Sequence, residues 1–296
     1  MSPGVDEALS ELSRRVHLTP GGLRFDHEEL AQDKAVQLLS ERVHNAFFCR
    51  RLGAAPALPR ASGDGGLVAH LASATRGAAG WEPSWRVVKA GPGWAFVSDG
   101  RLCLFLDEPG YFSPPEARVG DPVVVRVPRA RENLTPYRFT LFGGAGPAPT
   151  NEQYVKLFLP LTLEGTAPLV ELLASRHCDR LAFTLYISNS PDDFERVDAA
   201  VVDLARRDEE ALQRLIIDFV RVHRGAARTG APLFARSVQA GLARADASGP
   251  HDAGDGFGKR RCRWLAEEVW AALQAGEKSP QAWKARLTAS LSGPGR

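Results

Sequence analysis

The sequence is poor in the residues that mark several specialised classes of protein. Its four cysteines are far apart and form no CxxC pair, which argues against a disulfide scaffold and against a zinc cluster. It contains no run of eighteen apolar residues, as a membrane-spanning helix needs, and its opening residues lack the apolar stretch of a signal peptide. We therefore expect a soluble cytoplasmic protein with reduced thiols.

An excess of either charge is also missing. Lys and Arg together number 37 and Asp and Glu number 35, a formal net charge of +2, whereas nucleic-acid binders usually carry a marked basic excess. The signatures GxSxG and HExxH, the Walker loop and the kinase HRD and DFG motifs are absent as well. We expect neither nucleic acid nor membrane as a partner, and neither a metal nor an organic cofactor.

What is present is an ordinary globular composition, with 44% hydrophobic and 24% charged residues. The first eighty residues look helical, with a helix predicted over 27–48, and the Gly/Ala/Pro-rich stretch 51–66 looks like a loop or linker. From Trp85 the pattern changes to short apolar runs broken by Gly and Pro. These runs predict the strands of a mostly antiparallel sheet: WRVVKA, GWAFVSDG, RLCLFLDE, DPVVVRVP, YRFTLFGG, YVKLFLPL, LAFTLYIS and RVDAAVVDL.

Two later segments have clear helical periodicity. Apolar stripes predict helices over about 208–224 and about 258–273. The order of helices, then sheet, then mixed elements indicates an α+β fold: a helical N-terminal region followed by a mostly antiparallel sheet flanked by helices. We predict two parts, a helical region at 1–80 and an α+β domain at 81–296.

Single basic residues interrupt four of the strand-like runs. Arg126 lies in VVVRVP, Arg138 in YRFTLF, Lys156 in YVKLFLPL and Arg196 in FERVDAAVV. A charge within an apolar strand usually marks the solvent side of a sheet with one buried face. The alternative is that the four strands line one cationic cleft, in which a buried Lys could act as a base near neutral pH.

The start of the predicted helix at 258–273 carries charges of the unfavourable sign. Lys259, Arg260, Arg261 and Arg263 lie in its first turns, where the helix dipole favours anions. An anion such as phosphate docked among them would relieve this mismatch, since free backbone N–H groups point the same way. The competing interpretation is a solvated face with Asp252 and Asp255 as local partners.

The C-terminal half resembles the HopA-type effector family. The resemblance lies in three blocks at 154–202, 230–246 and 255–273 and covers roughly residues 120–275. Relatives of that family occur in bacterial gene clusters for modified peptides, where they look like lyases beside a kinase-like partner. The resemblance implies that the kinase phosphorylates Ser or Thr of a precursor peptide. The lyase then eliminates phosphate to leave dehydroalanine or dehydrobutyrine, as in lanthipeptide and thioamitide biosynthesis.

The resemblance also assigns individual residues. Arg196 and Asp198 fall on the family's Arg-x-Asp position, and Arg261 falls on the Arg of its FGxxRCR block. Lys156 occupies a position that is often Arg in relatives. The chain departs from the pattern at Tyr186, where a Lys is expected, and also at Pro160 and Arg260.

The resulting hypothesis gives each basic residue a role. Lys156 would be the base that removes the Cα proton, and Tyr186 would donate a proton to the leaving oxygen. Three arginines would clamp the leaving phosphate, and two further residues would make secondary contacts with it: Arg138, Arg196 and Arg261, then Arg126 and Lys259. The competing hypothesis is a non-catalytic effector, or a subunit that binds a kinase or a leader peptide. The Tyr at position 186 favours that alternative.

Overall fold

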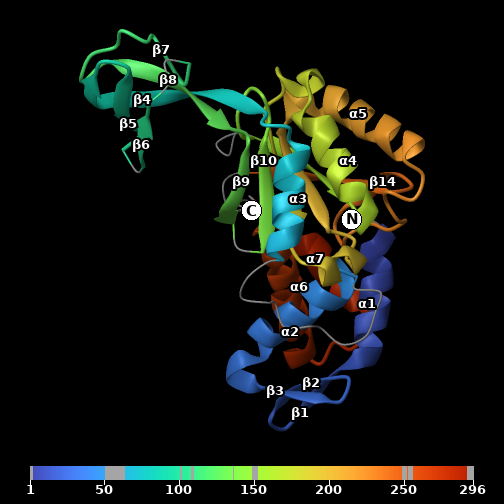
Figure 1. Cartoon of the computed structure of the whole chain (residues 1–296). Helices are drawn as coiled ribbons and strands as arrows, with labels where there is room; N and C mark the ends of the chain where they lie inside the picture. The colour runs from blue at the N-terminus through green and yellow to red at the C-terminus, as the bar shows by residue number, and fades with distance from the viewer. Residues whose placement is uncertain are drawn as a thin grey trace.

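The computed structural model describes residues 3–50, 64–100, 102–107, 110–135, 137–148, 153–248, 252 and 256–291. It has the α+β architecture that the sequence predicts, with an N-terminal helix followed by antiparallel sheets and further helices (Figure 1). Its sheets have three, seven and five strands. Within these ranges, none of the helices is long and apolar enough to cross a bilayer.

The N-terminal region combines helices with a small sheet. In chain order its elements are α1 (Pro3–Arg15), β1 (Val16–Thr19), β2 (Gly22–Phe25), β3 (Glu28–Ala31), η1 (Gln32–Lys34), α2 (Ala35–Val43) and a π-helical turn, η2 (His44–Phe48). The helix predicted over 27–48 therefore begins only at Ala35. Residues 28–31 form a strand instead, because Leu30 is buried opposite Leu23 of β2 while its neighbours are exposed.

The seven-stranded sheet is the centre of the molecule, and all its neighbouring strands are antiparallel. In spatial order its strands are β14 (Arg236–Gln239), β15 (Leu242–Ser248), β11 (Gln153–Leu159), β13 (Ala200–Ala205), β12 (Phe183–Ser188), β10 (Arg138–Phe142) and β9 (Ala130–Thr135). Residues directly opposite one another share a face of a sheet. Lys156, Asp203 and Thr184 are paired in this way, so all three side chains lie on one face.

The other face of this sheet is apolar. Alternate residues of the same strands, such as Val155, Leu157 and Leu185, are fully buried there. Three helices cover this face: α3 (Gly65–Ala74), α4 (Leu163–Ala174) and α5 (Glu209–Val222) (Figure 1). The helix predicted at 208–224 is confirmed as α5. Helix α3 lies in the region 1–80 that was expected to be helical, but its bounds were not predicted. Asp64 caps it by accepting the backbone N–H of Leu67 at 3.0 Å.

The face that carries Lys156 packs against the N-terminal and C-terminal helices. Tyr154, Phe158 and Ala245 of this face share one buried core with α1, α2, α6 (Gly256–Gln274) and α7 (Pro280–Leu291). The helix predicted at 258–273 is confirmed as α6. It comes close to the π-helical turn at Gly258, where an added Cβ would lie 2.5 Å from the Phe48 ring.

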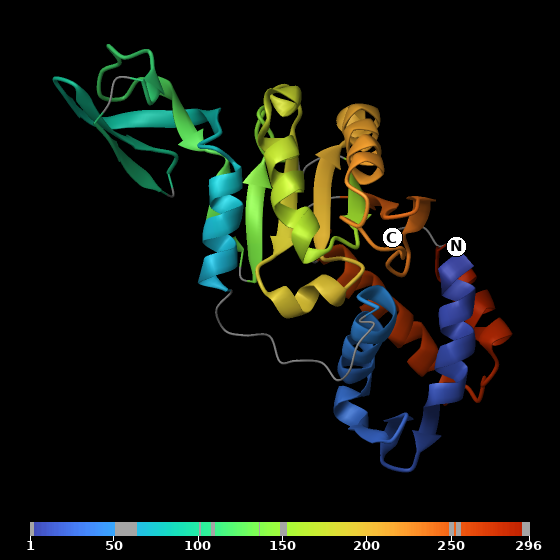
Figure 2. The ribbon, with the colours of Figure 1, turned by 45° about the vertical axis from the view of Figure 1, so that its right-hand side comes forward.

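A five-stranded antiparallel sheet projects from this body (Figures 1 and 2). Its spatial order is β6 (Cys103–Leu106), β5 (Trp94–Ser98), β4 (Ala79–Gly91), β8 (Pro122–Pro128) and β7 (Phe112–Ser113). Its own core contains Trp85, Val87 and Val125. The strands predicted from Trp85 onward are therefore divided between two sheets. Short 3-10 turns complete the description: η3 (Arg176–Cys178), η4 (Pro191–Glu195) and η5 (Arg206–Asp208).

Candidate functional site

A buried ion pair lies at the centre of the polar face. The Lys156 ammonium donates to Asp203 Oδ1 at 2.5 Å, and both side chains are almost completely excluded from solvent. The two residues come from neighbouring strands, β11 and β13, that are otherwise apolar at this level. Lys156 Nζ also lies 5.7 Å from the centre of the Tyr154 ring. Removing two charges from water is costly, so this pair needs a reason other than packing.

Three buried polar atoms around this face have no hydrogen-bond partner among the described residues: Tyr154 Oη, Thr140 Oγ1 and Arg261 Nε. Burial, reinforced by the nearby Asp203 and Asp252, raises the pKa of Tyr154 well above its ordinary value, so its hydroxyl keeps its proton. Buried polar groups are normally paired, and each exception calls for an explanation. All three groups can donate to an anionic oxygen.

Two arginines and one aspartate form a second cluster at the end of the same face. Arg196 grips Asp198 with two parallel hydrogen bonds, Nε to Oδ1 at 2.8 Å and Nη2 to Oδ2 at 2.7 Å. Arg138, at the start of β10, donates to the Asp198 carbonyl oxygen at 3.1 Å and approaches its carboxylate at 3.6 Å. Burial acts to raise the pKa of Asp198, but Arg196, Arg138 and His44 outweigh it and hold that pKa well below its usual range.

The N-terminal region contributes directly to this cluster. His44 and Phe48 of the π-helical turn line a small cavity of about 10 Å³ together with Asp198 and, from the sheet and α6, with Phe158, Val201, Phe257 and Gly258. The Cys49 carbonyl accepts the Val197 backbone N–H at 2.9 Å and so fixes the segment that carries Arg196 and Asp198. π-helical turns of this kind occur frequently at functional sites. Burial, with Asp198 adding to it, raises the pKa of the Cys49 thiol well above its ordinary value, so it is not a thiolate nucleophile.

Helix α6 brings a third group of charges. Arg261 packs over the Phe257 ring at 5.5 Å, and burial lowers the pKa of its guanidinium despite the opposing effect of Asp252. Asp252 is fully buried and accepts a hydrogen bond from Arg260 Nε at 2.9 Å. The predicted pairing of this basic segment with Asp252 is therefore present for Arg260. Phe257, whose ring Arg261 covers, lines the same small cavity as Asp198.

The predicted site residues fall into two groups. Lys156, Arg138, Arg196, Arg261 and Tyr186 all lie on or against the polar face, with Tyr186 directly opposite Val201 and half-buried. Two residues are not brought together with them. They are Arg126 and Lys259, which are both exposed.

Arg126 is the clearer correction. It is an outward-facing residue of β8 in the five-stranded sheet, where Val125 and Val127 on either side fill that sheet's core. Strand alternation puts Arg126 in solvent, so it does not take part in a phosphate clamp. Lys259 is exposed on the first turn of α6, on a different side of that helix from the buried Cys262 and Leu265.

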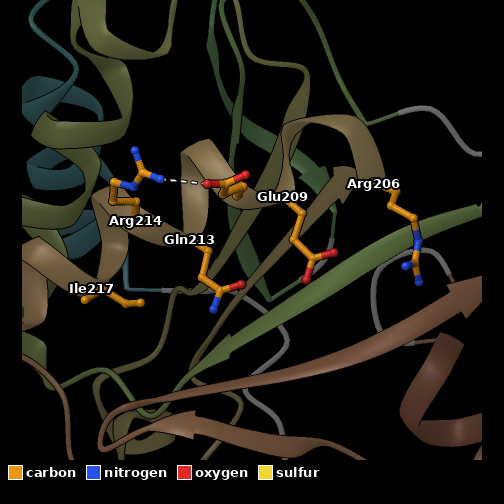
Figure 3. A pocket seen from close by; sticks show the side chains of 6 residues that line it. Arg206, Glu209, Gln213, Arg214 and Ile217 are labelled. Atoms are coloured by element: carbon orange, nitrogen blue, oxygen red, sulfur yellow. Dashed lines mark hydrogen bonds and ion pairs between the residues drawn. The ribbon is translucent and has the colours of Figure 1, made fainter.

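A wider hollow lies on the opposite side of the central sheet. It follows the outer surface of α5, where Arg214 Nη2 donates to Glu210 Oε1 at 2.7 Å (Figure 3). Glu209, next along the helix, pairs with Arg244 of β15 at 2.5 Å. Each of these charges has an opposite charge beside it. This hollow therefore lacks the unpartnered donors that distinguish the polar face.

Sequence reasoning missed several members of the site. Asp203 lies in an apolar strand just as Lys156 does, and that shared signal would have found it. Tyr154, Thr140 and His44 have no comparable signal, because only the strand register and the π-helical turn bring them here. In the part of the chain that the structure describes, no group of three or more His, Cys, Asp or Glu side chains is arranged to hold a metal.

Comparison with known proteins adds a family. The sequence profile of the HopA1 effector protein family matches residues 129–294, which contain the seven-stranded sheet and α4 to α7 but not the projecting sheet. A solved structure, that of the effector protein from Pseudomonas syringae pv. tomato strain DC3000, is 10% identical with a TM-score of 0.38. The match covers 80% of this chain and 88% of that one. No curated protein matches the chain.

Proposed function

This chain belongs to the HopA1 effector protein family, and we propose that it is a phosphoserine/phosphothreonine lyase. Its substrate would be a precursor peptide phosphorylated by a kinase-like partner, and its product dehydroalanine or dehydrobutyrine. One observation carries the proposal. Tyr154 Oη and Thr140 Oγ1, buried donors without partners in the described chain, share a sheet face with the Lys156–Asp203 ion pair, and Arg261 Nε, a third such donor, lies on α6, which packs against that face. A phosphorylated side chain offers acceptors for all three.

The arginines supply the charge clamp in this proposal. Arg261 has a buried Nε–H without a partner in the described chain, and Arg138 and Arg196 both contact Asp198, which lines the small cavity. Guanidinium groups bind phosphate with two parallel hydrogen bonds. Charge that grows on the departing phosphate is stabilised by such fixed donors, which is usually the largest contribution to catalysis. Lys259, which is exposed at the start of α6, is not part of this clamp.

Lys156 and Tyr186 move the protons. A base needs the neutral amine, which forms when Lys156 passes a proton to Asp203 across their 2.5 Å contact and leaves both groups uncharged. The amine then takes the Cα proton, the electron pair of the Cα–H bond forms the Cα=Cβ bond, and the Cβ–O bond breaks. Tyr186 gives its proton to the oxygen that leaves with phosphate. The reaction is redox-neutral, and positioned proton transfer of this kind contributes roughly 10²–10⁴-fold.

A second candidate is a non-catalytic subunit that binds a kinase or a phosphopeptide. The enclosure of the charges favours it: Lys156 is fully buried against Asp203, and Arg196 is occupied by Asp198. A protein that only binds needs no exposed base. The two candidates differ in one product, because binding alone never removes phosphoric acid from the peptide.

Incubation with a phosphoserine peptide, followed by mass spectrometry, separates them. We expect the peptide to lose the mass of phosphoric acid, and we expect K156M/D203L to abolish this loss while the protein stays folded. The matched control is K284M/D6L, which removes an exposed Lys–Asp pair of 2.7 Å between α7 and α1 and should leave turnover unchanged. Undiminished turnover in K156M/D203L would remove Lys156 from the base role. Phosphopeptide binding without mass loss, with the kinase-like partner also present, would establish the second candidate.

A further inference from the structure

The projecting sheet has one face built from aromatic and basic side chains. Strand alternation sends Trp85, Val87, Val97 and Val125 into the core of this sheet, and the residues between them point outward. We call this outward surface the aromatic–basic face. It consists of Trp81, Arg86, Lys89, Trp94, Phe96, Phe105, Val124 and Arg126.

Three aromatic rings of this face, those of Trp94, Phe96 and Phe105, form a continuous cluster. Phe96 and Phe105 stand opposite each other on β5 and β6 with ring centres 5.0 Å apart, and Trp94 lies within 5.9 Å and 6.1 Å of them. Phe105 is 54% exposed and Trp81 is 49% exposed. Single exposed apolar residues are normal on a protein surface, but a contiguous exposed patch marks an interaction site.

The charges on the aromatic–basic face have one sign. The strands place Arg86, Lys89 and Arg126 on it, and among the described strand residues facing this way there is no Asp or Glu. Lys89 Nζ lies 5.8 Å from the centre of the Trp94 ring, so a cation sits beside the aromatic cluster. Arg126 stands directly opposite Trp81 and repeats that combination nearer the body. A ligand that matches this surface is negatively charged and partly apolar.

The exposed edge of this sheet indicates the chemical class of the ligand. β6, which carries Phe105, is the last strand of the sheet and has β5 as its hydrogen-bonded neighbour within the described ranges. An extended peptide can add to such an edge through its backbone, with alternate side chains beside the exposed rings. Neither a nucleic acid nor a lipid headgroup offers this backbone pairing. The chain's net charge of +2 is also low for a nucleic-acid binder.

We propose that the aromatic–basic face binds an extended acidic peptide segment that carries aromatic or aliphatic residues. Acidic side chains pair with Lys89, Arg86 and Arg126, and apolar side chains pack on Phe96, Phe105 and Trp94. The proposal does not rest on lyase activity, since this face precedes residues 129–294 and its binding is measured without elimination.

The test is fluorescence anisotropy of a labelled, unphosphorylated peptide that alternates Glu with Leu and Phe, added to the full chain. We expect saturable binding that weakens as salt is raised from about 0.05 M to about 0.3 M, since screening reduces charge attraction. F96S/F105S should raise Kd by about tenfold or more. V222S removes an exposed apolar side chain at the end of α5 and is the matched control, with no expected change.

The charge contribution has its own variants. K89E/R126E should raise Kd at low salt by about tenfold and lose most of that effect at high salt. K278E, an exposed lysine between α6 and α7, is the control for added negative charge. The proposal would be overturned if a peptide with Lys in place of each Glu bound equally well. Unchanged Kd in both double variants would also overturn it. So would preferential binding of single-stranded oligonucleotide or anionic vesicles at this face.

Discussion

The two faces of the seven-stranded sheet are built from the same strands but have opposite chemistry. On β11, Val155, Leu157 and Leu159 face α4 and α5, whereas Tyr154, Lys156 and Phe158 face α6 and the N-terminal helices. Both faces are buried. The apolar face needs no explanation beyond the hydrophobic effect, at roughly 25 cal/mol for each Å² removed from water. The polar face encloses an ion pair and donors without partners in the described chain.

This contrast supports the proposal that the polar face serves a function other than stability. A buried ion pair is weak evidence of stabilisation, because well-packed apolar residues of similar volume often replace it at no cost. The buried donors of Tyr154, Thr140 and Arg261 support the same conclusion, because a buried hydroxyl or guanidinium nitrogen without a hydrogen bond destabilises the folded protein. Equivalent substitutions on the two faces, with stability and turnover measured separately, test whether the faces differ in this way.

The largest effect is expected from breaking the ion pair on one side. Asp203→Ala leaves the Lys156 ammonium buried without its carboxylate and should lower the free energy of unfolding by about 3–5 kcal/mol. K156M/D203L removes both charges together and should unfold at nearly the wild-type urea concentration. Urea denaturation followed by circular dichroism measures both. If the double variant is as unstable as Asp203→Ala, the pair is structural and the contrast between the faces fails.

Leu157→Ala makes the equivalent change on the apolar face. Leu157 is fully buried beneath α4 and α5, and its truncation should cost about 2–5 kcal/mol through lost burial and a residual cavity. Turnover per folded molecule should stay at the wild-type level, because no group of the polar face moves. The measurement pairs urea denaturation with the phosphopeptide assay below the unfolding transition. A specific loss of turnover would show that the faces are not independent.

A smaller effect should appear in the acid range. The pKa of Asp198 is depressed in the folded chain, so its contribution to stability is complete above the unfolded value of about 3.9. That contribution is lost as pH falls from there toward the folded value. Arg196→Gln removes the strongest partner and should flatten this acid slope, with a loss on the order of 2 kcal/mol at neutral pH. Urea midpoints between pH 7 and pH 2 test this.

The matched control for that series is Arg221→Gln, which removes an exposed pair with Asp218 of 3.2 Å on α5. Its acid slope should equal that of the wild type, since exposed pairs contribute little. An unchanged slope in Arg196→Gln would mean that Arg138 and His44 alone hold the carboxylate ionised.

Local patterns predicted the two most strongly periodic helices well but not the pairing of strands. The stripes at 208–224 and 258–273 correspond to α5 and α6, because helical periodicity is a local property. Residues 28–31 were predicted as helix, since a short segment with one large apolar residue fits both periods. The division of strands between two sheets depends on contacts distant in sequence. The boundary at residue 80 stays a prediction.

The candidate site shows the same limit at the level of single residues. VVVRVP and YVKLFLP each place one cation in an apolar run, yet Arg126 is exposed and Lys156 is fully buried. The difference lies in what covers each sheet: β8 has one buried face, whereas β11 is covered on both. The local sequence around either cation does not show how many faces of its sheet are covered. The roles assigned to Lys156, Tyr186 and the arginines therefore stay predictions until turnover is measured.

The smallest change in stability is expected from a substitution in the hollow on α5. This substitution tests charges on the side of the sheet that carries the apolar face. Arg214 and Glu210 are paired at 2.7 Å but both are largely exposed, so water already solvates them well. Arg214→Gln should change the free energy of unfolding by less than about 0.5 kcal/mol and leave phosphopeptide turnover unchanged. A clear loss of turnover in this variant would move the search for the site to α5, because the polar face would then no longer account for the chemistry alone.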